Sequence, residues 1–457
     1  MLGRASVAAV FAIVLSSHPA EGQQPARAET LARLDSVARA FVASRQAPGL
    51  SVFVLRGSDT LLLGGYGYAN LEDSVPVTPR TVFRIGSLTK QFTAAAVMRM
   101  VQEGGVSLED TLQRFLPTFP TQGHRVTIRH LLTHTSGIKD YTAVGAEWQR
   151  VARLDLPHDS VFALFATKPF DFAPGERFLY DNSGYYLLGV ILERVSGQSY
   201  DRALAERLFA PLGLANTLYC FTRPLIPRRA QGYARAGEGF VNAEQRSMVL
   251  PFAAGGLCST APDMVAWTCA LWAGRVVQPG GLSAMTTSAR LASGATTGYG
   301  FGLAIDSLDG HLRVSHGGGI SGFTGSVAHF PADNLTIAVL DNSGDANASR
   351  LATQIARVAL GIPLPVVRNL PLSAAERARY VGDYSVGPMT ARVREEGDHL
   401  TAQVPGRGSF GLLAQGQHIF IASYDENVRF EFQVAGERAT GFTLYSGGLV
   451  HRATRAN

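Results

Sequence analysis

The 457-residue sequence lacks features that mark several common classes of protein. Its formal net charge at pH 7 is only +5, and its longest basic run is the pair Arg228-Arg229, which excludes an extended basic surface for nucleic acid. Hydrophobic residues make up 46% of the chain and charged residues 17%, so we expect a globular protein and not a disordered one. The length predicts two or three domains.

Lysine is scarce. Only three of the 41 basic residues are lysines, namely Lys90, Lys139 and Lys168, and the rest are arginines. A lysine can lose its proton inside a protein, whereas an arginine essentially cannot. Each of the three lysines is therefore a candidate for a role that arginine could not fill.

The first 22 residues have the pattern of a secretory signal peptide. Arg4 supplies a positive start, residues 5–16 form a short apolar stretch, and residues 20–22 offer small side chains for cleavage. A membrane anchor is the alternative, but this stretch is too short to span a bilayer, and no later stretch is apolar enough. Because no cysteine lies near the cleavage site, we expect export to a periplasm or the exterior without a lipid anchor.

Cysteine is also rare, with Cys220, Cys258 and Cys269 in the whole chain. Cys269 falls within an expected helix at residues 262–273, which favours a disulfide between Cys220 and Cys258. The alternative is three buried, unreactive thiols, since sequence alone does not fix connectivity.

The pattern of elements predicts an α+β domain over residues 28–362. Strands lie at both ends of this segment and helices in its middle, so we expect one sheet that joins both ends. The expected elements are a helix at 28–46, strands at 49–55 and 60–69, a helix at 88–102, helices and loops over 106–275, strand character over 299–340 with the glycines 317–319 between two strands, and a helix at 348–360.

A second domain is expected over residues 370–457, after a proline-containing linker at 361–365. Short runs of alternating polarity predict a small all-β domain, either a barrel or a sandwich. The expected strands are 390–393, 399–404, 418–423, 429–434 and 441–445.

The strongest chemical motif is Ser87-Leu88-Thr89-Lys90, at the start of the expected helix. The i, i+3 spacing puts the hydroxyl and the amine on one helical face, where a lysine with a lowered pKa can accept the serine proton. The alternative to a catalytic pair is a serine that caps the helix beside a lysine exposed to solvent. A second copy, Ser136 to Lys139, has a glycine beside its serine, which disfavours helical register.

Two further groups carry polar chemistry. Tyr180 and Asn182 precede an expected helix at 184–195, where they could relay a proton and donate to a substrate carbonyl, or simply pack and cap the helix. His316 is followed by three glycines, and glycines in strand-like sequence often mark close approach of a ligand or another backbone. The rival interpretation, a lipase oxyanion loop, needs a Gly-x-Ser-x-Gly elbow that the chain lacks.

His130 and His134 stand four residues apart, as a metal pair on a helix would. No glutamate base lies between them, and no third ligand is placed nearby, so we expect a packed, hydrogen-bonded His134 and no metal or cofactor.

Taken in order, these motifs resemble the serine β-lactamase and penicillin-binding-protein superfamily, within its class C β-lactamase, D-alanyl-D-alanine carboxypeptidase and esterase branch. The likeness covers roughly residues 30–360. It rests on residues 83–90, 131–137, 254–257 and 299–302, besides the motifs above. The fold implied is an antiparallel sheet flanked by helices, and the tail resembles the lipocalin-like β domain of many members.

The resemblance implies a role for each residue at the site. Ser87 would be the acylated nucleophile and Lys90 its activating partner, while Tyr180 would relay protons; which of the latter two is the acylation base stays open. Asn182 would bind the substrate's amide carbonyl. His316 and Gly318 would belong to the substrate-binding strand, and the N–H groups of Ser87 and Gly319 would form the oxyanion hole.

Two departures from the family pattern bear on the substrate. His316-Gly317-Gly318 stands where β-lactamases have Lys-Thr-Gly, which removes a permanent cation that helps to hold the β-lactam carboxylate. Asp181 replaces the serine that is common between the tyrosine and the asparagine, and would add a negative charge. Both changes favour a peptidase or esterase over an efficient β-lactamase.

Three functions therefore compete: a hydrolase of a small ester or peptide amide, a β-lactamase, and a non-catalytic binder of penicillin or peptide. The retention of Ser87, Lys90 and Tyr180 counts against the last. The C-terminal domain could bind a carbohydrate or lipid, but a structural cap on the hydrolase is the preferred interpretation because no aromatic cluster stands out in it.

Overall fold

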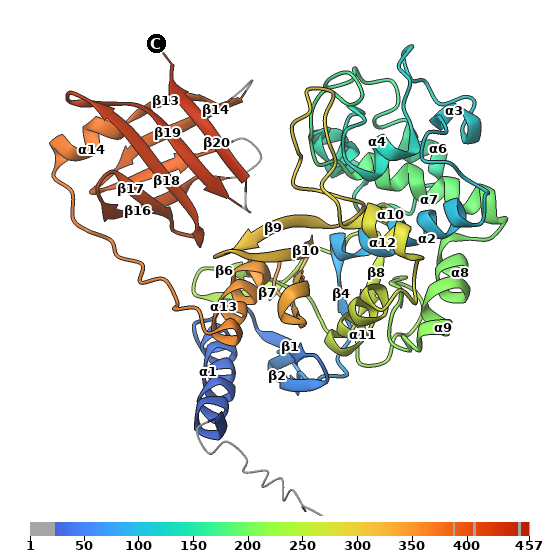
Figure 1. Cartoon of the computed structure of the whole chain (residues 1–457), viewed down its shortest axis with the longest axis horizontal. Helices are drawn as coiled ribbons and strands as arrows, with labels where there is room; N and C mark the ends of the chain where they lie inside the picture. Colours follow the sequence, from blue (N-terminus) through green and yellow to red (C-terminus); the bar gives the residue numbers. More distant parts are fainter. Residues whose placement is uncertain (1–22, 387–388, 405–407, 447–448, 457) are drawn as a thin grey trace, which may run out of the picture.

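The computed structural model describes residues 23–386, 389–404, 408–446 and 449–456. The predicted signal peptide lies outside these residues. Figure 1 shows a barrel at the C-terminal end of the chain beside a larger part made of a sheet and helices. No helix in the described part of the chain is both long and apolar enough to cross a membrane.

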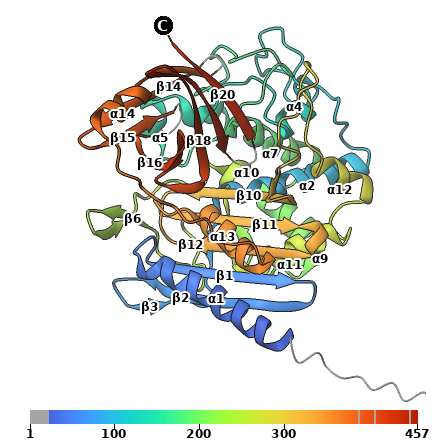
Figure 2. The ribbon, with the colours of Figure 1, turned by 60° about the vertical axis from the view of Figure 1, so that its left-hand side comes forward.

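The larger part is built on a seven-stranded antiparallel sheet in the order β3-β2-β1-β12-β11-β10-β9. Figure 2 shows β10, β11, β12, β1 and β2 one below another. The N-terminal β1 pairs with the late strand β12, which confirms that one sheet joins both ends of the domain. The strands are β1 (Gly49–Arg56), β2 (Asp59–Asn70), β3 (Val75–Pro76), β9 (Ala304–Leu308), β10 (His311–Ile320), β11 (Phe323–Phe330) and β12 (Leu335–Asp341).

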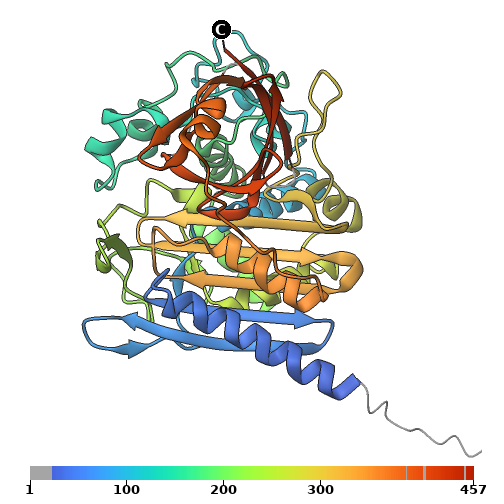
Figure 3. The ribbon, with the colours of Figure 1, turned by 90° about the vertical axis from the view of Figure 1, so that its left-hand side faces the viewer.

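Helices cover both faces of this sheet. Its central strands are therefore buried on both sides and have continuous apolar sequences. α1 (Gln23–Ala43) and α13 (Ala348–Leu360) lie across one face (Figure 3). Ile337 and Val339 of β12 pack into the core on that face, and Ala338 and Leu340 pack into the core on the opposite face.

The helices of the opposite face surround α2 (Thr89–Gln102), most of whose residues are buried. The 3₁₀ turn η1 (Gly86–Leu88) leads directly into α2. The other helices are α3 (Leu112–Phe115), α4 (Ile128–Leu132), η2 (Tyr141–Ala143), α5 (Ala146–Val151), α6 (His158–Phe162), α7 (Asn182–Ser196), α8 (Tyr200–Leu204), η3 (Ala205–Phe209), α9 (Ala210–Leu212), α10 (Phe252–Gly255), α11 (Ala261–Trp272) and α12 (Pro279–Met285).

Short strands tie this helical region together. They are β4 (Phe83–Arg84), β5 (Leu218–Tyr219) and β8 (Leu257–Ser259), which form one small sheet, and the hairpin β6 (Tyr233–Ala236) and β7 (Gly239–Asn242). A disulfide joins Cys220 to Cys258, as predicted, and Cys269 in α11 stays a thiol. Because Cys258 lies in β8, which pairs with β4, the bond braces the strand that leads into η1.

The C-terminal part is a closed barrel of eight strands, which settles the choice between barrel and sandwich. Its strands are β13 (Gly382–Val386), β14 (Met389–Glu396), β15 (His399–Gln403), β16 (Phe410–Gly416), β17 (Ile419–Ala422), β18 (Asp425–Ala435), β19 (Arg438–Ser446) and β20 (Leu449–Arg455), preceded by α14 (Ala374–Tyr380). The sequence prediction named five of them. It missed β13, β16 and β20, in which glycines and polar residues interrupt the apolar alternation.

One buried carboxylate connects the barrel to the larger part. Glu426 of β18 forms an ion pair with Arg350 and accepts a hydrogen bond from Gln354 Nε2 at 2.7 Å, both from α13. Asn347 Nδ2, at the start of α13, donates to the carbonyl oxygen of Tyr424 at 3.3 Å. These contacts seat the barrel on the helix that covers the sheet.

Candidate active site

Ser87 lies in the turn η1, immediately before α2. The residue before it, Gly86, has φ +50°, and a Cβ atom there would lie 2.7 Å from the carbonyl oxygen of Gly319. A glycine is therefore required at position 86, both for its backbone conformation and for the close approach of β10. The result is that the Ser87 hydroxyl lies beside the backbone of the neighbouring strand.

Lys90 is fully buried one turn further on, and its amine nitrogen contacts three oxygens. Nζ lies 3.2 Å from Ser87 Oγ, 2.8 Å from Asn182 Oδ1 and 2.9 Å from the carbonyl oxygen of Ala254. Burial lowers the pKa of Lys90 to about 7, against the opposing pull of Asp140 and Asp181. An amine that is partly neutral near pH 7, in contact with a serine hydroxyl, can accept its proton.

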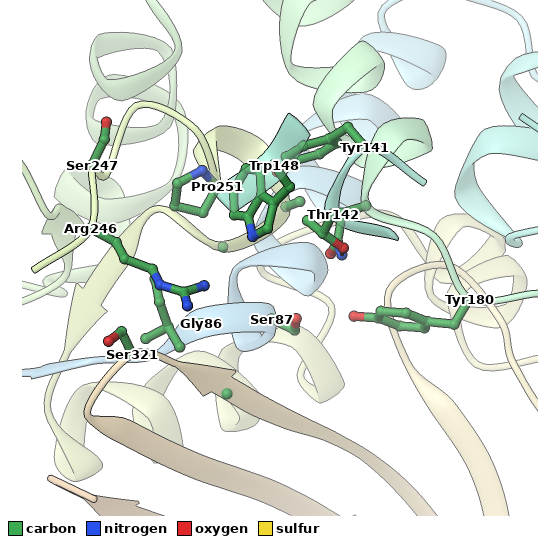
Figure 4. Close-up of a pocket in the computed structure, with 15 residues that line it drawn as sticks. Gly86, Ser87, Tyr141, Thr142, Trp148, Tyr180, Arg246, Ser247, Pro251 and Ser321 are labelled. Carbon is green, nitrogen blue, oxygen red and sulfur yellow. Dashed lines mark hydrogen bonds between the residues drawn. The ribbon is translucent and has the colours of Figure 1, made fainter. Parts of the chain in front are cut away.

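Tyr180 also lies beside Ser87. Its hydroxyl points toward Ser87 in Figure 4 and is buried, without a hydrogen bond of ordinary geometry to any described residue. Lys90 Nζ lies 4.7 Å from the centre of its ring. Burial raises the pKa of the Tyr180 phenol, and its contact with Ser87 offsets this only in part. The phenol is therefore protonated at neutral pH and can donate.

Asn182 is the first residue of α7, two residues earlier than the expected start of that helix. Its side-chain oxygen accepts from Lys90, and its nitrogen lies 3.2 Å from Thr142 Oγ1 and 3.3 Å from Asp140 Oδ2. Both amide hydrogens thus have partners already. In this arrangement Asn182 orients Lys90. To donate to a substrate carbonyl, the Asn182 amide would have to give up its hydrogen bond to Thr142 or Asp140.

The Asp181 carboxylate contacts Gly184 and His134 and not Ser87, although its charge acts on the pKa of Lys90. Its carboxylate caps α7 by accepting from the N–H of Gly184 at 2.5 Å, and it lies 3.3 Å from His134 Nδ1. Burial raises the pKa of Asp181 to about 7, so only part of a negative charge is present at neutral pH. Aspartate in place of serine at position 181 therefore adds less negative charge to the site than a fully ionised carboxylate would.

His134 has the packed, hydrogen-bonded role that was predicted for it. It is completely buried, and its Nδ1 also accepts from the N–H of Asp181 at 3.2 Å. His130 has a different partner, because its Nδ1 accepts from the N–H of Thr127 and completes the N-terminal cap of α4. The two histidines do not share a ligand site.

The second Ser-x-x-Lys copy is not helical. Ser136 is buried, and Lys139 pairs with Asp171 at 2.7 Å, away from that serine. This outcome agrees with the expectation drawn from Gly137, which has φ +74°.

The three glycines after His316 lie inside β10, and not between two strands as predicted. They were misassigned because glycine contributes no side-chain pattern to a strand. Gly319 lines the cleft beside Ser87. Gly318 packs against the chain that precedes Ser87, and a Cβ atom on it would lie 2.1 Å from the carbonyl oxygen of Ile85.

His316 is not among the residues that line the cleft. Its Nε2 is 2.8 Å from the Tyr299 hydroxyl, and the side chain is buried, with its ring centre 6.1 Å from that of Tyr180. Burial, with a contribution from the Lys90 charge, lowers the pKa of His316 to about 3. The imidazole is therefore neutral and offers no cation to a substrate carboxylate.

A cleft of about 250 Å³ opens directly over Ser87 (Figure 4). It contains four of the residues predicted from sequence, namely Ser87, Tyr180, Asn182 and Gly319. Gly86, Ala254 and Gly255 belong to the motifs 83–90 and 254–257 quoted for the family resemblance. Sequence reasoning did not single out the remaining lining residues, most of which come from segments distant in the chain from Ser87. The cleft is lined by Gly86, Ser87, Tyr141, Thr142, Trp148, Tyr180, Asn182, Arg246, Ser247, Pro251, Ala254, Gly255, Gly319, Ile320 and Ser321.

The sequence profile of the Beta-lactamase family matches residues 34–360. The chain belongs to this family. Penicillin-binding protein 4* of Bacillus subtilis is 29% identical over 434 residues, which cover 89% of this chain and 94% of that protein. A D-aminopeptidase of Brucella anthropi is 29% identical over 433 residues, which cover 88% of this chain and 79% of that protein.

Among solved structures, the octameric penicillin-binding protein homologue from Pyrococcus abyssi aligns with a TM-score of 0.66 and 28% identity, over 93% of this chain and all of that one. The predicted fold, with its antiparallel sheet, flanking helices and C-terminal barrel, is confirmed. The prediction of a serine hydrolase of this family is confirmed as well.

Proposed function

We propose that this protein is an exported serine hydrolase that cleaves a small ester or peptide amide through an acyl-enzyme on Ser87. The observation that carries the proposal is the buried Lys90 amine, 3.2 Å from the Ser87 hydroxyl and with its pKa lowered to about 7. An amine with that pKa is partly neutral at pH 7 and can accept the serine proton. Lys90 is therefore the acylation base, because the pKa of Tyr180 is displaced away from neutrality.

The reaction has two steps. In the first, neutral Lys90 takes the Ser87 proton, Oγ attacks the substrate carbonyl, and the N–H groups of Ser87 and Gly319 stabilise the oxyanion. The bond to the leaving group then breaks as Tyr180 gives its proton to the departing nitrogen or oxygen, and the proton held by Lys90 replaces it on Tyr180. In the second step, water adds to the acyl carbonyl while neutral Lys90 takes its proton, and the bond to Oγ then breaks as that proton returns to Ser87 and the carboxylic acid leaves.

Export is supported by the pattern of residues 1–22 and by the Cys220–Cys258 disulfide, a bond typical of oxidising compartments. The relation to a D-aminopeptidase and a penicillin-binding protein favours peptide-like substrates, including those with D-residues. A β-lactamase is the weaker candidate, because neutral His316 stands where a permanent cation would help to hold the β-lactam carboxylate.

Intact-mass spectrometry tests this proposal. The full exported chain is incubated with a fluorophosphonate and, separately, with penicillin, beside the variant Ser87→Ala. We expect the fluorophosphonate to add once to the wild type and not to the variant. A long-lived penicillin adduct would indicate a penicillin-binding peptidase, and its absence an ester or amide hydrolase. No labelling of the wild type would favour a non-catalytic binder instead.

A further inference from the structure

Arg246 brings a positive charge to the cleft that the proposed reaction does not use. Its guanidinium points into the cleft beside Ser87 (Figure 4), and its Nε is buried without a hydrogen-bond partner in the described part of the chain. Among the described residues, its one ion pair is a loose contact of Nη2 with Glu244 at 3.4 Å. Of the described side chains that line the cleft, Arg246 is the only charged one.

The segment that carries Arg246 is fixed on both sides. Before it, the carbonyl oxygen of Glu244 accepts from Ser321 Oγ at 2.6 Å, which ties the segment to the turn after β10. After it, Ser247 donates from its N–H to the carbonyl of Ala152 at 2.9 Å and from its hydroxyl to Asp155 at 2.6 Å. The backbone at Arg246 is thus held in place, so a ligand gains the full interaction with little ordering cost.

The charge of Arg246 is not neutralised by its neighbour. Glu244 pairs more closely with Arg153, whose Nη2 and Nε lie 2.7 and 3.0 Å from its Oε1. Two guanidinium groups therefore share one carboxylate, which leaves net positive charge at the cleft. A partly buried guanidinium with unused donors is a binding group for a carboxylate.

The position of Arg246 identifies the part of the substrate that it meets. In Figure 4, Tyr180 and Arg246 lie on opposite sides of Ser87. Because Tyr180 serves the leaving group in the proposed mechanism, the Arg246 side receives the acyl portion. Trp148 and Tyr141 also line the cleft and provide apolar surface for the stem of that acyl group.

We propose that Arg246 selects substrates whose acyl portion carries a carboxylate. This inference rests on the proposed hydrolase function and specifies its substrate class. An acyl group that ends in a free amine would be opposed by the same charge, so an acidic acyl residue is favoured over a basic one.

The test uses acyl groups that differ in the charge of the side chain. N-acetylated p-nitroanilides of glutamic acid, glutamine and lysine, each as the D and the L form, are compared by kcat/KM. For any anilide that is not cleaved, protection of Ser87 against fluorophosphonate labelling measures its binding. We expect the glutamic acid compound to exceed its glutamine isostere by about tenfold, the size of one charge-assisted contact, and the lysine compound to be the poorest.

Variants test whether Arg246 causes the preference for an acidic acyl group. Arg246→Gln should remove it, Arg246→Lys should keep part of it, and Arg153→Gln, which frees the Glu244 carboxylate to pair with Arg246, should weaken it. Fluorophosphonate labelling of Ser87 in each variant verifies that the site is folded. An equal response to acid and amide in the labelled wild type, or a preference that survives in Arg246→Gln, would overturn the inference. Absence of wild-type labelling would instead refute the hydrolase proposal.

Discussion

Gly318 of β10 touches the carbonyl oxygen of Ile85: a Cβ atom on the glycine would lie 2.1 Å from it. Strand β10 is thereby pressed against the chain that leads into Ser87. The same approach brings Gly319 to the edge of the cleft. The spacing of the two oxyanion donors in the proposed mechanism thus depends on the absence of a side chain at position 318.

Substitution of Gly318 should therefore damage both the fold and the site. We expect Gly318→Ala to destabilise the protein by about 1–3 kcal/mol, as overpacking does, and to slow labelling of Ser87 as β10 moves away. Thermal unfolding and the rate of fluorophosphonate labelling measure the two effects. Gly319→Ala is the matched control for stability, because a Cβ atom there meets nothing within 4 Å. Equal melting temperatures for the two variants would contradict this account.

The rate of Ser87 labelling should depend on pH through Lys90. The pKa of Lys90 is lowered to about 7, so the neutral amine predominates above that pH and is lost below it. We expect the rate to rise about tenfold per pH unit on the acid side and to level off above pH 7. The measurement is the second-order rate constant for fluorophosphonate labelling from pH 5 to 9. A rate that still rises about tenfold per pH unit up to pH 9, as the ordinary lysine pKa of 10.5 predicts, would show that the amine is not held as described.

Removal of the Tyr180 hydroxyl should affect poor leaving groups most. An anilide or peptide nitrogen must be protonated as it departs, whereas p-nitrophenolate leaves without a proton. We expect Tyr180→Phe to reduce kcat for amides by about 10²–10⁴ and for p-nitrophenyl esters far less. Tyr185→Phe is the control, because the Tyr185 hydroxyl binds the carbonyl of Leu132 and not Ser87. Equal losses for both substrate types would argue against a proton relay through Tyr180.

The elements that sequence predicts best are those with local stop signals. Helix α13 has the predicted bounds, because Asn347 caps its start and Gly361 ends it with φ +72°. The glycines of β10 carry no such pattern, and only the pairing of that strand with β11 reveals them as part of it. Strand pairing is set by residues distant in the chain, which a local pattern does not contain.

The same distinction applies to the site. Ser87 and Lys90 are found from sequence because one helical turn fixes their geometry. Asp140 and Arg246 are not, since only the packing of separate loops brings Asp140 to Asn182 and Arg246 to the cleft. His316 is found from sequence as part of a motif, but its protonation state is not. Its burial beside Tyr299, which keeps the imidazole neutral, arises only when the chain folds.

The Cys220–Cys258 disulfide should contribute measurably to stability. The bond closes a loop with a sequence separation of 38 residues, for which loss of chain entropy in the unfolded state predicts about 4 kcal/mol. We expect the double variant Cys220→Ser and Cys258→Ser to melt several degrees below the wild type and to label more slowly at Ser87, because β8 holds the strand β4 that leads to η1.

Cys269→Ser is the control that separates loss of the bond from loss of a thiol. Cys269 is half-buried in α11 and is not bonded, so its substitution should leave the reducing-agent dependence of the melting temperature unchanged. The wild type and this control should both melt at a lower temperature once reduced, whereas the double variant should not respond. If reduction under unfolding conditions does not change the melting temperature of the wild type, the disulfide is not formed. In that case residues 220 and 258 would be held together by the pairing of β5 with β8 and by packing against Val82 and Met248.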